Sequence, residues 1–129
     1  MRPFAVAVLV LLLAGCVSSP QAPPQTAAPA VIRPGTLNAL TDADRATIEA
    51  GVRAYLQDDG SATFRTMIST KSREGVVSVC GYVNAKANPG DKPYIGTLAA
   101  GSFIVSGMGT GNPEIIAVQS TCGRLGINI

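Results

Sequence analysis

The sequence predicts a small α+β domain in which one N-terminal helix packs on an antiparallel sheet of about four strands. Two observations lead to this fold class. Apolar residues recur with the period of a helix between residues 42 and 57, and they alternate with polar residues, as in strands, from residue 64 onward. A third observation sets the limits of the domain, because residues 1–35 have a different composition. We therefore expect a single globular domain over residues 36–129.

The helix predicted over residues 42–57 has a start signal, an apolar face and an end signal. Thr41 and Asp44 have the spacing of a capping box, in which each side chain bonds the backbone N–H of the other residue. Four apolar residues then share one face of the helix, namely Ile48, Val52, Tyr55 and Leu56. The run 58–60, two aspartates and a glycine, should end the helix.

Alternation and β-branched residues predict strands over four segments, at 64–68, 76–85, 94–106 and 114–120. The third segment contains Gly96 and Gly101, and glycine inside a strand indicates a bulge or a bend. Polar turns or loops are expected between the strands, at 71–75, 88–93 and 107–113. The glycines of the last loop do not favour a phosphate-binding loop, because their spacing differs and a strand is expected after them.

The first fifteen residues have the pattern of an export signal. Met1 and Arg2 give a positively charged start, and residues 4–14 form an unbroken apolar run. Such a run spans about 16 Å as a helix, which is too short for a bilayer core of about 30 Å. We therefore expect residues 1–15 to be a cleaved secretory signal peptide.

The apolar run ends in "LAGC" at residues 13–16, which resembles the lipobox of bacterial lipoproteins. The resemblance implies transfer of diacylglycerol to the Cys16 sulfur, cleavage before Cys16 and acylation of the new amine. A thiolate is a suitable acceptor, and two or three acyl chains would hold the protein on a membrane. Val17 and Ser18 follow in place of the aspartate that retains enteric lipoproteins at the inner membrane. The resemblance therefore points to the outer membrane, on its periplasmic side.

A proline-rich tether is expected between Cys16 and the domain, over residues 16–35. It holds five prolines, one basic residue and no acidic residue. Proline fixes φ and removes a hydrogen-bond donor, so neither a helix nor an interior strand is predicted here. An extended, disordered segment with a reach of at most about 60 Å is the expected state.

Charge is balanced in the predicted domain, which has five arginines and three lysines against five aspartates and three glutamates. No block of like charge occurs along the sequence, so nucleic acid is not an expected partner, and no polybasic patch for acidic lipids is expected. The expected partner is a membrane, reached through the lipid on Cys16. Another envelope protein or a glycan is a further candidate, and no cofactor or metal is expected.

Cys80 and Cys122 form an even pair once Cys16 is assigned to the lipid. A structural disulfide is the favoured interpretation, because disulfides persist in exported domains. The alternative is a nucleophilic or metal-binding cysteine. The chain has no histidine to activate a thiol or to complete a zinc site, which argues against that alternative.

The lack of histidine also removes serine–histidine and cysteine–histidine catalysis, and we do not expect an enzyme. A small hydrolase that uses two carboxylates is an alternative. It would need two acids in one cleft about 5 to 9 Å apart. The candidate acids are Asp58, Asp59, Glu74, Asp91 and Glu114.

The most distinctive stretch of the domain, residues 78–96, surrounds one predicted loop. It carries five candidate ligand or partner residues, namely Tyr82, Asn84, Lys86, Asn88 and Tyr94. Asn84 and Lys86, at a strand end, have side chains suited to an anion or a glycan. The simpler interpretation is that Asn84 turns the chain and Lys86 is solvated.

Two segments, "DDGSATF" at 58–64 and "VCGYVNAK" at 79–86, resemble a small proteobacterial envelope domain of unassigned function. Asp59 and Ala87 depart from that domain's pattern, and so does the run "NPGDKPY" at residues 88–94. The resemblance implies no activity that could be transferred. Together with the lipobox it implies a lipid-anchored envelope protein with a non-catalytic binding or structural module. A periplasmic inhibitor of a lysozyme-like hydrolase is the alternative of a different class.

Overall fold

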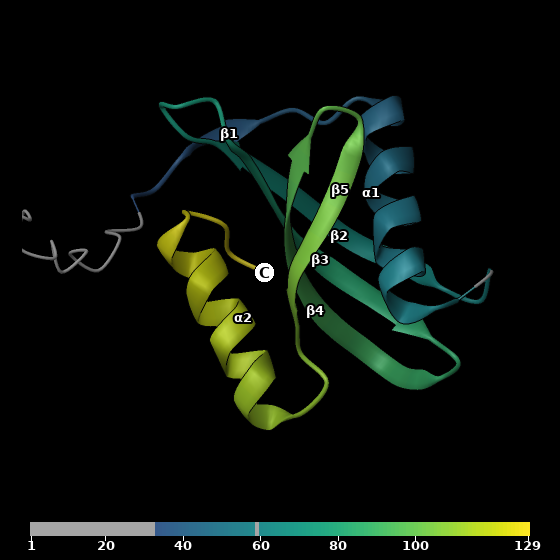
Figure 1. The fold of residues 1–129 in the computed structure, drawn as a ribbon. Helices are drawn as coiled ribbons and strands as arrows, with labels where there is room; N and C mark the ends of the chain where they lie inside the picture. Colours follow the sequence, from purple (N-terminus) through teal and green to yellow (C-terminus); the bar gives the residue numbers. More distant parts are fainter. Residues whose placement is uncertain (1–32, 59) are drawn as a thin grey trace, which may run out of the picture. The chain divides into compact units, whose positions relative to one another are not determined.

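A computed structural model describes residues 33–58 and 60–129, which belong to one compact unit. The domain is α+β, with two helices and a five-stranded antiparallel open sheet (Figure 1). The strands lie in chain order across the sheet, as β1 Thr36–Asn38, β2 Thr63–Lys71, β3 Val77–Ala85, β4 Asn88–Ala99 and β5 Ser102–Met108. Helix α1 (Asp42–Leu56) links β1 to β2, and helix α2 (Asn112–Arg124) follows β5.

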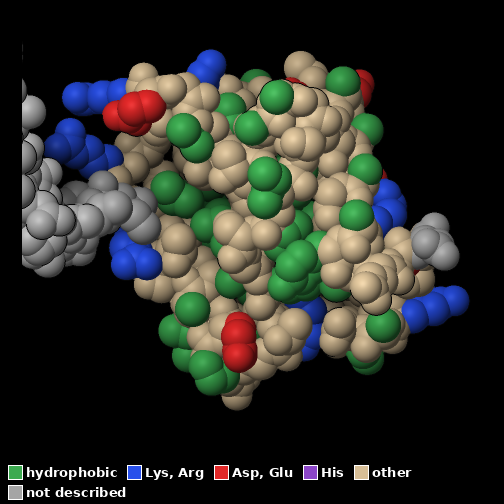
Figure 2. All heavy atoms as spheres, viewed as in Figure 1, with side chains coloured by type: hydrophobic (Ala, Val, Ile, Leu, Met, Phe, Trp, Pro, Cys, Tyr) green, Lys and Arg blue, Asp and Glu red, His purple; other side chains and the backbone are tan. Residues whose placement is uncertain are grey.

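The predicted signal peptide, Cys16 and all but the last residues of the tether lie outside the described residues. In the ranges that are described, neither helix is long and apolar enough to cross a membrane. Seen from the side of Figure 1, basic side chains gather beside β1 and the β2–β3 turn, where the described chain begins (Figure 2).

Helix α1 begins at the predicted capping box. Thr41 Oγ1 accepts a hydrogen bond from the Asp44 N–H (3.1 Å), and the Asp44 carboxylate accepts one from the Thr41 N–H (2.9 Å). The Thr41 backbone N–H, followed by the Thr41 side chain, lowers the pKa of Asp44. At the other end Gln57 has a left-handed φ of 54° and caps the helix. The predicted helix is confirmed to within one residue.

The two helices cover opposite faces of the sheet. Successive residues of a strand point to opposite faces, so Val79 and Cys80 of β3 belong to different cores. The α1 core consists of Ile48, Val52, Ala62, Val79, Val83, Ala85, Tyr94, Phe103 and Met108. The α2 core consists of Cys80, Ile95, Val118, Cys122 and Ile127. Strand β3 is therefore buried on both of its faces.

The expected disulfide joins Cys80 of β3 to Cys122 of α2, with the two Cα atoms 6.2 Å apart. Both cysteines are completely buried. The bond links residues 42 apart in the sequence, and closing a loop of that length stabilises a fold by about 4 kcal/mol in the chain-entropy model. The disulfide thus fixes α2 to the sheet.

The strand predicted at 114–120 is wrong, because this segment lies in helix α2. Three of its four apolar residues are β-branched, and a run this short fits the period of a strand or of a helix equally well. Pro113 in the first turn favours a helix start. Val118 and Cys122 are four residues apart, so on a helix both face the sheet. The helical conformation is the one that allows the disulfide and this contact together.

The loop predicted at 88–93 is also wrong, because it forms the first half of β4. Strand β5 pairs with β4 only as far as Tyr94. Before that residue, Asn88, Lys92 and Pro93 pair with β3, and on the other side the Pro93 carbonyl accepts a hydrogen bond from the Gly109 N–H (2.8 Å). A strand with one free side tolerates proline, which cannot donate a ladder hydrogen bond. This accounts for the two prolines that indicated a loop.

The strand predicted at 94–106 consists of parts of two strands, β4 and β5. Between them Ala100 and Gly101 form a hairpin turn in which both have positive φ, 48° and 74°. The bend expected from Gly101 is thus a complete reversal of the chain. The bulge expected at Gly96 is confirmed by a register shift between Ile95 and Gly96. The sheet therefore has five strands, namely the predicted β2 and β3, the strands β4 and β5 that divide this segment, and β1, which was not predicted.

Tyr94 lies at the centre of the α1 core and is completely buried. Its ring makes edge contacts with Phe64 and Phe103, at centroid distances of 6.4 and 6.2 Å. A Cβ at Gly81 would lie 2.7 Å from the Tyr94 hydroxyl, so the tyrosine needs glycine at that position. The hydroxyl has no hydrogen-bond partner among the described residues, and burial raises its pKa.

Replacing Tyr94 by phenylalanine is therefore expected to leave the free energy of unfolding unchanged or to raise it by about 1 kcal/mol. A buried hydroxyl without a partner costs about 1–3 kcal/mol, which the substitution removes. Tyr82→Phe is the matched control. Its hydroxyl accepts a hydrogen bond from Gln119 (2.9 Å), so that variant should lose about 1 kcal/mol. Urea unfolding followed by circular dichroism measures both, and a larger loss in Tyr94→Phe than in Tyr82→Phe contradicts the assignment.

Candidate functional site

The candidate residues of the 78–96 stretch are divided between the two faces of the sheet. Tyr82 and Asn84, two residues apart in β3, lie on the face that α2 covers. Tyr94 lies in the α1 core on the opposite face, and the structure does not bring it to their surface. Lys86 is exposed in the β3–β4 turn, and Asn88 begins β4 half-buried. Only Tyr82 and Asn84 share a face with one another.

Tyr82 and Asn84 belong to a polar surface with Asp91, predicted only as a candidate acid, and with Arg65 and Gln119, which sequence reasoning missed. Arg65 stands opposite Tyr82 on β2, and its Nε lies 3.5 Å from Oδ1 of Asp91. Asn84 Nδ2 donates to the same Asp91 oxygen (3.4 Å). From α2, Gln119 Nε2 donates to the Tyr82 hydroxyl. We call these five residues, Arg65, Tyr82, Asn84, Asp91 and Gln119, the polar face.

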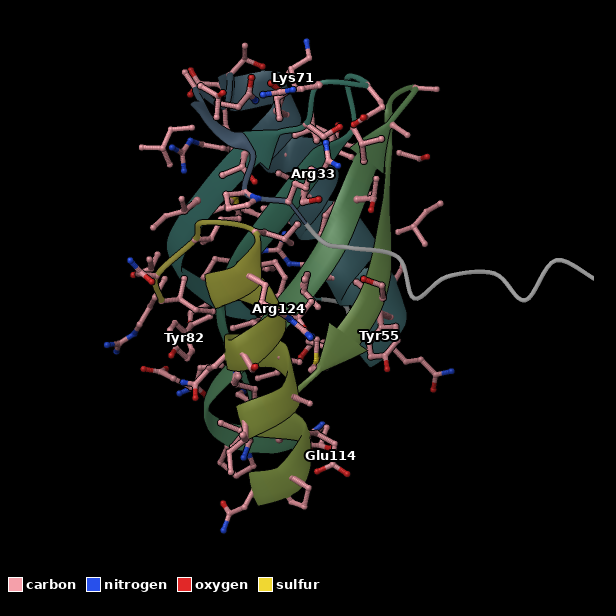
Figure 3. All side chains as sticks on the ribbon, turned by 90° about the vertical axis from the view of Figure 1, so that its left-hand side faces the viewer. Arg33, Tyr55, Lys71, Tyr82, Glu114 and Arg124 are labelled. Atoms are coloured by element: carbon pink, nitrogen blue, oxygen red, sulfur yellow. A yellow bond between two sulfur atoms is a disulfide. The ribbon has the colours of Figure 1, made fainter. Side chains whose placement is uncertain are left out.

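The polar face has one base and one acid, which form an exposed ion pair. Tyr82 lies on the outer side of the sheet beside α2 (Figure 3). A tyrosine ring combines an apolar body with a polar tip, and the flanking amides and guanidinium supply several hydrogen-bond donors and acceptors. This combination suits an uncharged polar ligand, such as a sugar, better than an anion.

The two segments that resemble an envelope domain meet in the structure. The Asp58 carboxylate accepts hydrogen bonds from the backbone N–H of Gly60 (2.9 Å), from that of Ser61 (2.7 Å) and from the Ser61 hydroxyl. Ser61 Oγ in turn accepts a hydrogen bond from the Lys86 N–H (3.2 Å). This chain of hydrogen bonds connects the end of α1 to the β3–β4 turn.

Asp58 is thereby a structural acceptor. The Ser61 hydroxyl, followed by the Gly60 N–H, lowers the pKa of Asp58 to about 2. A carboxylate with so low a pKa is a weak base at neutral pH, and its oxygens are already occupied. A role as general base in a hydrolase is therefore poorly supported for this residue.

The other candidate acids lie on separate elements. Glu74 is exposed in the β2–β3 turn, Asp91 is paired with Arg65 near the start of β4, and Glu114 is exposed in the first turn of α2. Asp59 lies outside the described residues. Within residues 33–58 and 60–129, no group of three or more cysteine, aspartate or glutamate side chains is placed to hold a metal ion.

The glycine-rich segment before α2 leads into a helix, contrary to the expectation of a strand. Its N-cap, Gly111, supplies no side-chain hydrogen bond. The Glu114 carboxylate stands close to that residue, since a Cβ at Gly111 would lie 2.8 Å from Glu114 Oε2. A negative charge at this position disfavours an anion at the helix start.

Comparisons of the chain with protein-family models, with curated proteins and with solved structures found no match. The resemblance of residues 58–64 and 79–86 to an envelope domain therefore stays a prediction.

The Asp58 hydrogen bonds predict a pH-dependent contribution to stability. The pKa of Asp58 lies near 2 in the folded protein and near its usual value of 3.8 in the unfolded chain. The carboxylate therefore stabilises the fold above about pH 4, and this contribution is lost as the pH falls toward 2. The difference in unfolding free energy between the wild type and Asp58→Asn should therefore be constant above about pH 4 and should decrease as the pH falls toward 2.

Urea unfolding at a series of pH values between 2 and 6 measures this difference. Ser120→Ala, which replaces an exposed side chain outside the hydrogen-bond chain and changes no titratable group, is the control and should have the same effect at every pH. An Asp58→Asn effect that stays constant from pH 6 to pH 2 would contradict the role assigned to Asp58.

Proposed function

We propose that this protein is a lipid-anchored component of a bacterial cell envelope, located at the outer membrane and facing the periplasm. Its domain binds a ligand or a partner without catalysis. The observation that carries the proposal is the order of segments in the chain, in which an apolar run and "LAGC" at 13–16 precede a proline-rich stretch and a folded domain. A secretory signal, an acylation site and a tether occur in that order in lipoproteins.

The pairing of the cysteines supports this proposal. Cys80 and Cys122 are bonded to each other and buried, which leaves Cys16 as the odd cysteine of three. Disulfides persist chiefly in oxidising compartments, so the bond agrees with export, although weakly. Each cysteine then has one use, and none is left over for another chain.

The ligand surface in this proposal is the polar face. It lies toward the Ala85 end of β3, whereas β1 and the start of the described chain lie beside the Val77 end. The polar face is therefore not at the end of the domain where the described chain begins. The balanced charge of the polar face favours an uncharged polar ligand such as a glycan.

Intact mass spectrometry of the protein extracted from membranes tests the anchor. The expected mature chain begins at Cys16 and carries diacylglycerol and an added acyl chain. Cys16→Ser should give a precursor that keeps residues 1–15 and carries no lipid, because serine does not supply the acceptor thiolate. Ser18→Ala, two residues further on, is the matched control and should be processed like the wild type. A wild-type chain that begins elsewhere or lacks acyl mass overturns the proposal.

A further inference from the structure

We propose that the end of the domain next to the tether is a docking surface for a bilayer with anionic phospholipid headgroups. This surface, the tether-end patch, consists of Arg33, Leu37, Lys71, Arg73, Val76 and Arg124. The inference rests on the proposed lipid anchor, which brings a membrane within reach of this end. It adds a contact made by the folded domain to the contact made by the lipid on Cys16.

The sheet brings the first part of the patch together. Strand β1 pairs with the end of β2, so that Thr36 stands opposite Lys71 and Leu37 opposite Thr70. The chain then turns through residues 72–76 into β3, and the Ser72 N–H bonds the Val76 carbonyl (2.9 Å). Leu37 and the residues of this turn are thereby neighbours at one end of the sheet.

The end of α2 completes the patch. The Gly35 N–H donates to the Leu125 carbonyl (3.1 Å), immediately after the last residue of α2. This hydrogen bond joins the segment that begins at Arg33, the first described residue, to the end of α2, which carries Arg124. Figure 3 shows Lys71 at the top of the molecule, Arg33 below it and Arg124 on α2, with Glu114 at the far end of that helix.

The fold concentrates positive charge at this end although the sequence has no basic block. Four of the nine described bases lie here with one acid, Glu74, whereas the other described residues hold five bases and six acids. All four bases are exposed, and within the described ranges none of them forms an ion pair. The cluster is visible beside β1 in Figure 2. Such an asymmetry orients a protein toward an anionic surface.

Two large apolar side chains are exposed at this end of the sheet. Leu37 is 72% exposed and Val76 is 48% exposed. Exposed apolar residues among bases have the composition of a membrane-surface contact, in which bases meet headgroup phosphates and apolar side chains enter the boundary of the acyl region. The tether leaves from the same end, so the anchoring bilayer is the nearest anionic surface.

The docking contact can be weak and still orient the domain. Each base near an anionic membrane raises the partition coefficient about fivefold. The lipid anchor keeps the patch at a high effective concentration beside the bilayer, so a modest affinity is enough for contact. A docked tether-end patch would leave the polar face, at the other end of β3, exposed to the periplasm.

Vesicle co-sedimentation of residues 16–129 carrying Cys16→Ser tests the patch without the signal peptide or the lipid. The core and the disulfide lie within residues 33–129, so this chain keeps both. We expect it to bind vesicles that contain phosphatidylglycerol and not vesicles of phosphatidylcholine alone. The double variant Lys71→Gln/Arg73→Gln should lower the partition coefficient about 25-fold.

The matched control is Lys86→Gln/Lys92→Gln, which removes the same charge at the opposite end of β3. It should lower the partition coefficient less than about threefold. Equal losses in the two double variants would show attraction by net charge alone and would overturn the proposal. Absence of binding to the phosphatidylglycerol vesicles would also overturn it. Whether the protein carries the lipid anchor is tested separately, by the mass of the native protein.

Tryptophan fluorescence gives a second readout, because the chain contains no tryptophan. Leu37→Trp places a reporter in the patch, and Tyr55→Trp places one at a 55% exposed position on α1. Phosphatidylglycerol vesicles should shift the emission of Leu37→Trp to shorter wavelength and leave that of Tyr55→Trp unchanged. Equal shifts, or a shift of Tyr55→Trp alone, would show that another surface meets the membrane.

Discussion

The disulfide between Cys80 and Cys122 is the constraint on which the rest of the domain depends. Strand β3 is buried on both faces, under α1 through Val79 and Val83 and under α2 through Cys80. The α2 core has five buried residues, whereas the α1 core has nine. A short helix is stable in water mainly through packing, so a core this small needs the covalent bond to fix α2. The position of α2 in turn allows Gln119 to bond the Tyr82 hydroxyl, and it allows the Leu125 carbonyl, just after α2, to bond the Gly35 N–H.

Both of the proposed surfaces follow from that arrangement. The polar face requires α2 beside β3, and the tether-end patch requires the end of α2 beside the first described residues. The two surfaces lie toward opposite ends of β3, one at its start and one at its end. In a lipid-anchored protein, one end would then meet the membrane while the other meets the ligand. The Asp58–Ser61–Lys86 hydrogen bonds fix the β3–β4 turn, at the same end of β3 as the polar face.

The features that the sequence predicted well are those with local causes. The capping box of Thr41 and Asp44 starts α1, and alternation places Tyr82 and Asn84 on one face. Helix α2 was missed because its β-branched residues fit the period of a helix and that of a strand equally well. The packing of Val118 and Cys122 against the sheet, which the local sequence does not show, favours the helix. The start of β4 was missed because its prolines are tolerated only where β5 ends. Arg65, Asp91 and Gln119 join the polar face through strand register and through the placement of α2, which no local pattern of the sequence indicates.

The three cysteines provide the most direct test of this account, because it assigns each of them one role. Peptide mapping of the membrane-extracted protein without reduction measures all three together. The account predicts a diacylglycerol-modified, acylated peptide that begins at Cys16, together with a disulfide-linked pair of peptides that contain Cys80 and Cys122. A disulfide from Cys16 to either of the other cysteines, or free thiols at Cys80 and Cys122, would contradict it.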